Sequence, residues 1–120
     1  MALPLSPQAI VNIAVQAAEN KKAMDVTVLD IRAVSIIADY FIICGGRTDT
    51  QVQAIVENIQ EDLKREGIIA LRREGFREAN WVLLDYGDVI IHVFQGAERQ
   101  FYNLERLWGD ARVVDDPVNI

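Results

Sequence analysis

Few residues in this sequence have side chains and spacing suited to chemistry, and the single histidine, His92, is the first of them. His92 and the single cysteine, Cys44, cannot complete an ordinary His/Cys zinc site, because such a site takes four ligands. General acid–base catalysis by His92 needs a substrate pocket and further polar groups, and the sequence supplies only Asp85 as a neighbour. We therefore expect a structural His–Asp pair, no catalytic residue, no metal and no cofactor.

The Gly45-Gly46 pair is the second candidate. It follows an apolar run and precedes a helix, an arrangement in which free backbone amides can hold a phosphate. A strand followed by Gly-Gly is also a feature of nucleotidyltransferases, but those enzymes hold magnesium with closely spaced carboxylates, and here Asp49 is followed by Thr50 and Gln51. The P-loop pattern is absent as well. A structural turn is the favoured interpretation, and an anion or nucleotide site at Gly45 and Gly46 is the alternative.

Large aromatic side chains are candidates for a binding surface, because such residues carry most of the binding free energy in protein interfaces. Trp81 begins a predicted strand directly after the polar loop 74–80. The sequence leaves two interpretations of Trp81 equally open: exposure with partner contact, and packing in the core. Trp108 lies on the apolar stripe of a predicted helix, which favours core packing.

A β-hairpin is predicted at 81–86 and 89–94, because Gly87-Asp88 places a glycine at the first central position of a type II′ turn. A two-residue loop fixes the register of the two strands. Leu84 then lies opposite Ile91, on a face that is wholly apolar and must belong to the core.

The other face of this hairpin is mixed in character. It places Trp81 opposite Phe94, with Asp85 diagonal to His92 and close enough for a polar interaction. Either a helix covers this face, with Asp85 and His92 satisfying each other, or the face is partly open to a partner.

A single α/β domain follows from the remaining elements. Ser6 and Thr48 are placed to cap two helices, the first from Pro7 to about residue 20 and the second ending before Gly67. Further strands are predicted at 24–31, 39–44 and 68–73, and a last helix at 97–108. We expect a mixed five-stranded sheet flanked by helices, with residues 1–111 as the domain and 112–120 as a C-terminal tail.

The charge balance bears on the kind of partner. Twelve basic and 18 acidic residues give a net charge of −6, which disfavours a direct grip on nucleic-acid phosphates and suits a basic protein partner. No apolar run is long enough to cross a membrane, and the first ten residues have no secretory or transit character. We expect a protein that stays in the cytoplasm, without a membrane partner.

Taken together, the motifs resemble the ribosomal silencing factor (Iojap) family, in unbroken order over residues 7–111. The residues that carry the resemblance are 38–43 leading to Gly45, Gln51 with Ala54-Ile55, Glu74-Gly75, Trp81 with Leu84-Asp85, 87–94, Arg99, Phe101-Tyr102, Leu104-Glu105 and Leu107-Trp108. The hairpin 87–94 joined to the last helix is the most specific part. Arg47 stands where many relatives have a small polar residue, and the C-terminal tail lies outside the resemblance.

The resemblance implies a nucleotidyltransferase-like fold without the catalytic carboxylates, in a protein that is not an enzyme. It implies binding to the large ribosomal subunit through its universal protein fourteen, which blocks joining of the small subunit and represses translation under nutrient limitation. A homodimer is implied for the free protein. The expected partner surface consists of Trp81, Glu74, Asp85 and Asp88. A residual nucleotidyltransferase that uses Gly45-Gly46 is the alternative.

Overall fold

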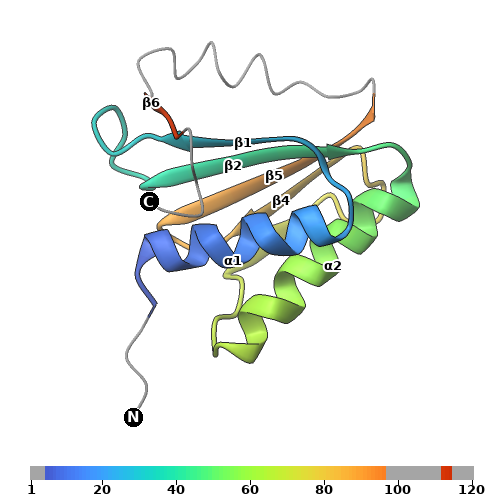
Figure 1. Ribbon diagram of the computed structural model, residues 1–120, viewed down its shortest axis with the longest axis horizontal. Helices are drawn as coiled ribbons and strands as arrows, with labels where there is room; N and C mark the ends of the chain where they lie inside the picture. Colours follow the sequence, from blue (N-terminus) through green and yellow to red (C-terminus); the bar gives the residue numbers. More distant parts are fainter. Residues whose placement is uncertain (1–4, 97–111, 115–120) are drawn as a thin grey trace.

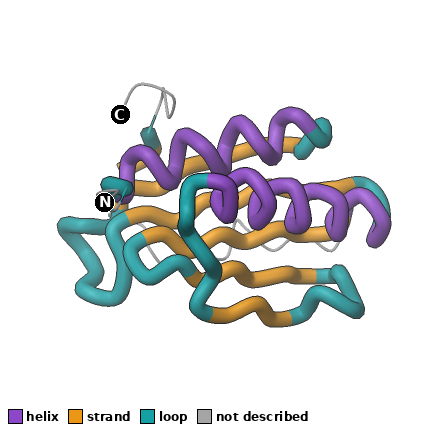
Figure 2. The backbone as a smooth tube through the Cα atoms, turned by 90° about the horizontal axis from the view of Figure 1, so that it is seen from below, coloured by secondary structure: helices purple, strands orange, loops and turns teal. Residues whose placement is uncertain are grey.

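The computed structural model describes residues 5–96 and 112–114, in which one sheet carries two helices on the same face (Figures 1 and 2). The helices are α1 (Pro7–Asn20) and α2 (Asp49–Arg65). The strands are β1 (Met24–Asp30), β2 (Tyr40–Gly46), β3 (Arg72–Glu74), β4 (Trp81–Asp85), β5 (Val89–Gln95) and β6 (Arg112–Val113).

The sheet is mixed, with strand order β3-β4-β5-β2-β1-β6. The two central strands, β2 and β5, are parallel, and every other pair is antiparallel. The five expected strands and the α/β class are confirmed. A sixth strand, β6, pairs with β1 and comes from residues expected in the tail. The predicted helix at 97–108 lies outside the described residues.

Both described helices begin where the sequence predicts. The Ser6 side chain accepts a hydrogen bond from the Ala9 amide at 3.2 Å, and Pro7 needs no amide hydrogen at the first helical position. Thr48 caps α2 by accepting from the Gln51 amide at 3.0 Å. The buried residues of α2 repeat at helical spacing and face the sheet: Val52, Ile55, Val56, Ile59 and Leu63.

Two predicted strand boundaries are wrong. Gly45-Gly46 does not break β2, because both glycines pair with β5 as part of the strand. A Cβ at Gly46 would lie 3.0 Å from Cγ2 of Val52, so the missing side chain lets the start of α2 approach the strand closely. The third strand spans Arg72–Glu74 rather than 68–73.

Core residues lie on both faces of the sheet. The larger core fills the space between the sheet and the two helices and includes Cys44, which is buried as predicted. Strand residues alternate between faces, so Phe41 and Ile43 belong to a smaller core on the opposite face. Phe94 of β5 joins this smaller core and is fully buried. On the strand face opposite the helices, buried side chains such as Phe94 can therefore support the side chains that lie over them.

Candidate functional site

Among the described residues, Trp81 is the large aromatic side chain exposed on the strand face opposite the helices. It opens β4, lies opposite Phe94 of β5, and stacks on that ring with centroids 5.1 Å apart and planes at 27°. Because Phe94 is fully buried, one side of the indole rests on a fixed support. The Trp81 residue nevertheless keeps 46% of its surface exposed. Of the two interpretations left open by the sequence, exposure of Trp81 holds.

His92 is the hydrogen-bond partner of this tryptophan. The indole Nε1–H of Trp81 donates to Nδ1 of His92 at 3.0 Å. His92 is 4% exposed and meets the ring of Phe41 edge-on, with centroids 5.0 Å apart. Burial lowers the pKa of His92 from 6.5 to about 4, so the imidazole is neutral at pH 7. Because Nδ1 accepts, the ring proton is on Nε2, which has no hydrogen-bond partner among the described residues.

The expected pair between Asp85 and His92 is wrong. Oδ1 of Asp85 accepts instead from the Gly87 amide at 2.8 Å, within the hairpin turn. Leu83 lies opposite His92 in the confirmed register, so Trp81 and Asp85 occupy its two diagonals. The twist of a β-hairpin makes the two diagonals unequal, and the long indole reaches His92 whereas the short carboxylate does not.

Arg72 is a charged member of this surface that the sequence did not reveal. It lies directly opposite Asp85 in the sheet, with its Nε 3.6 Å from Oδ2 of Asp85. Its Nη1 lies 3.0 Å from Oε2 of Glu74, two residues along the same strand. One arginine therefore partly neutralises two of the carboxylates expected to meet a partner. The pairing of β3 with β4 could have predicted Arg72, but the register across the loop 75–80 cannot be read from the residues.

Of the four residues expected in the partner surface, the structure brings three onto one side of β3 and β4. Glu74 lies opposite Leu83, the neighbour of Trp81 on that face, and Asp85 is at the far end of the same strand. Asp88 lies beyond it in the hairpin turn, where its backbone oxygen accepts from the amides of Asp39 at 2.7 Å and Tyr40 at 3.1 Å. The side of the sheet formed by Arg72, Glu74, Trp81, Leu83 and Asp85 is here called the Trp81 surface.

The Gly45-Gly46 end of β2 offers little to an anion. The Arg47 amide donates to Oε1 of Gln51 at 2.7 Å, and the Thr50 amide donates to Oδ1 of Asp49 at 2.7 Å. The Gln51 amide is taken by the Thr48 cap. Side chains of the protein therefore occupy three of the amides at the start of α2 that could hold a phosphate, which favours the structural interpretation of the glycine pair.

The described part of the chain has neither a cluster of metal-binding side chains nor a helix that could cross a membrane. Within residues 5–96 and 112–114, no group of three or more His, Cys, Asp or Glu side chains is arranged to hold a metal ion. Neither described helix has the length and apolar character needed to cross a membrane.

The fold and the Trp81 surface define a single-domain α/β protein with a half-exposed tryptophan on the sheet face that its described helices leave open. Over residues 4–119 the sequence matches the model of a family described as ribosomal silencing factor during starvation. The chain belongs to this ribosomal silencing factor family, and the resemblance found in the sequence is confirmed.

Known proteins similar to the chain agree with this assignment. The ribosomal silencing factor of Bacillus subtilis is 48% identical over 111 residues, which cover 92% of this chain and 94% of that protein. A crystal structure from Bacillus halodurans superposes with a TM-score of 0.82 at 41% identity, covering 91% of this chain and 99% of that one. A crystal structure from Chromobacterium violaceum gives 0.83 at 34% identity, with 88% of each chain covered.

Proposed function

We propose that the protein binds the large ribosomal subunit through its universal protein fourteen and blocks joining of the small subunit, which represses translation when nutrients are limited. Family membership and the name shared by its relatives support a role in ribosome silencing. The observation that supports the Trp81 surface as the contact is a half-exposed indole held by Phe94 and His92. Such a held aromatic ring loses little conformational entropy when a partner covers it.

Silencing by steric exclusion needs affinity and no chemical step. A submicromolar dissociation constant corresponds to roughly 8 kcal/mol or more of binding free energy. One tryptophan anchor with complementary charges around it supplies a large part of such a value. The net charge of −6 favours encounter with a basic ribosomal protein, and Glu74 and Asp85 add acidic groups on the same face of the sheet as the anchor.

The proposal treats the protein as a binder rather than an enzyme. The occupied amides at the start of α2 support this choice over a residual nucleotidyltransferase at Gly45-Gly46. Titration of purified protein with ATP and magnesium separates the two. Saturable binding with turnover would establish the enzyme, and the absence of binding supports the silencing factor.

The test of the proposed function uses isolated ribosomal subunits. The protein is expected to co-sediment with large subunits, and a large subunit carrying it is expected not to associate with small subunits. Failure of co-sedimentation, or normal joining by loaded large subunits, overturns the proposal. We further propose that the protein is cytoplasmic and that the free protein is a homodimer. Light scattering on the purified chain measures its mass and so tests the dimer.

A further inference from the structure

The indole N–H of Trp81 is already used inside the protein. A tryptophan side chain has one hydrogen-bond donor and no acceptor. In this structure the donor is directed at Nδ1 of His92 at 3.0 Å. A partner that covers Trp81 therefore finds no free polar group on the indole and meets the π face and edge of the ring.

His92 is placed to keep the indole in this state. It stands on β5, opposite Leu83 and diagonal to Trp81, and its ring is wedged against Phe41 at a centroid distance of 5.0 Å. With 4% of its surface exposed, His92 has little freedom to change rotamer or to be reached by a partner. Any effect of His92 on binding must therefore pass through Trp81 or through the stability of the sheet.

Two contacts together determine the orientation of the indole. Phe94 supports one ring face, with planes at 27°, and the bond to His92 prevents rotation of the ring within that plane. An exposed tryptophan without such a bond would sample several side-chain rotamers, and binding would have to select one of them. The surface that remains accessible is thus a single, preformed aromatic platform.

We propose that His92 is a positioning residue of the Trp81 surface: it takes up the indole N–H, so that Trp81 meets its partner with the ring alone. The complementary partner group is then an apolar side chain or a guanidinium lying on the ring, rather than a hydrogen-bond acceptor. Glu74, opposite Leu83 and so diagonal to Trp81 across the two strands, adds a carboxylate that suits a guanidinium. This inference rests on the proposed function, because it takes the Trp81 surface as the contact with the ribosomal protein.

Two variants of nearly equal shape isolate the acceptor. His92→Asn places an amide oxygen where Nδ1 stands, whereas His92→Leu has the same branching without an acceptor. The indole N–H of Trp81 is observed in ¹⁵N-labelled free protein and assigned with Trp81→Phe, since the chain has two tryptophans. We expect His92→Leu to speed hydrogen exchange at this indole by about tenfold and His92→Asn to leave it close to wild type. Equal exchange in all three proteins overturns the positioning role.

Measured binding to isolated large subunits then tests whether the hydrogen bond between Trp81 and His92 affects function. We expect His92→Leu to weaken binding by about tenfold and His92→Asn to restore most of it, with both variants confirmed as folded by their urea transitions. If His92→Leu binds as wild type although Trp81→Ala is impaired, the positioning role is overturned and the proposed function stands. If wild-type protein does not bind large subunits, the proposed function itself fails.

A third variant changes the ring of Trp81 and leaves the His92 side chain in place. Trp81→Phe keeps an aromatic face and lacks the N–H, so its affinity should fall several-fold less than that of Trp81→Ala. Equal losses in Trp81→Phe and Trp81→Ala would mean that the partner uses the N–H, which overturns the proposal. This comparison remains informative if His92→Leu fails to fold.

Discussion

Gly75 lies directly against the backbone of Trp81: a Cβ added at Gly75 would overlap the Trp81 carbonyl oxygen. Gly75 also has a φ of +78°, a backbone conformation that residues other than glycine rarely adopt. The tight turn after β3 therefore packs closely against the backbone of Trp81, the first residue of β4. The orientation of the proposed anchor depends on a glycine six residues earlier as well as on the rings beneath it.

Gly75→Ala should accordingly destabilise the fold and displace Trp81. Gly67 is a matched control, since its φ is +81° but nothing lies within 4 Å of an added Cβ. We expect Gly67→Ala to lower the free energy of unfolding by about 1 kcal/mol from backbone strain alone. Gly75→Ala should cost about 3 kcal/mol or more, because the backbone of β4 must also move. Urea denaturation measures both values, and equal losses would show that the contact with Trp81 is without consequence.

Trp81→Ala should weaken binding to the large ribosomal subunit by about 2 kcal/mol or more, because a well-packed central tryptophan is the usual hot spot of an interface. The fold should survive, since the residue is half exposed. Ile36→Ala is the control: this side chain is fully exposed on the loop between β1 and β2, at the opposite end of the sheet from Trp81. Interferometry with immobilised protein measures both affinities. Unchanged affinity in Trp81→Ala would remove the Trp81 surface from the proposal.

The stability of the fold should fall in acid because of His92. Its pKa is about 4 in the folded chain and 6.5 in the unfolded chain, so between these values only the unfolded chain binds the proton. The contribution is complete above pH 6.5 and is lost as the pH falls towards 4. We expect a loss of about 2 to 3 kcal/mol between pH 7.5 and 4.5.

Urea transitions of wild type and His92→Asn at the two pH values test this expectation. The carboxylates titrate in both proteins, so the difference between them isolates the imidazole. His92→Asn should lose less stability than wild type over the same interval. An identical loss in the two proteins would mean that His92 is protonated in the folded state as readily as in the unfolded chain.

The predictable parts of this structure are those governed by neighbours in the sequence. The hairpin register was predicted because Gly87-Asp88 leaves room for only a two-residue turn, and Gly87 has the expected positive φ of 85°. The caps at Ser6 and Thr48 were predicted for the same reason, since each acts on an amide three residues away.

The parts that escaped prediction depend on geometry between strands. Alternation in the sequence puts Trp81 and Asp85 on equal diagonals from His92, and only the twist of the folded hairpin decides between them. Arg72 became part of the surface through a pairing across a six-residue loop, whose register no local pattern specifies. A glycine pair after an apolar run predicts the end of a strand, whereas Gly46 continues β2. Its missing side chain leaves space for Val52 of α2, and this contact between strand and helix cannot be seen in the sequence.

Arg72 should slow encounter with a basic partner, because it neutralises part of the charge of Glu74 and Asp85. We expect Arg72→Gln to raise the association rate with large subunits by about twofold at low salt. The gain should disappear at high salt, where the Debye length falls to about 3 Å. The control with the same change in net charge is Arg65→Gln on α2, on the helix-bearing side of the sheet.

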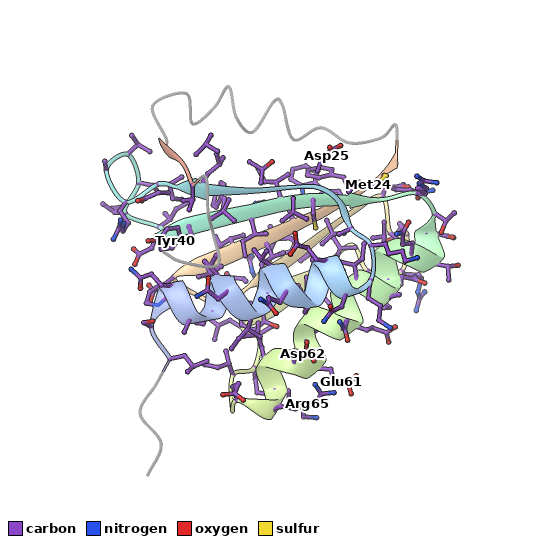
Figure 3. All side chains as sticks on the ribbon, in the orientation of Figure 1. Met24, Asp25, Tyr40, Glu61, Asp62 and Arg65 are labelled. Carbon is purple, nitrogen blue, oxygen red and sulfur yellow. The ribbon has the colours of Figure 1, made fainter. Side chains whose placement is uncertain are left out.

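Figure 3 shows Arg65 beside Glu61 and Asp62 on that helix, and it forms ion pairs with both of them. If the Trp81 surface is the contact, the acceleration in Arg72→Gln should exceed that in Arg65→Gln, since the freed carboxylates of Glu74 and Asp85 would face the partner. Stopped-flow mixing at several salt concentrations measures the rates. Equal acceleration by the two variants would mean that only the net charge of the protein steers association, and Glu74 and Asp85 would lose their place in the partner surface.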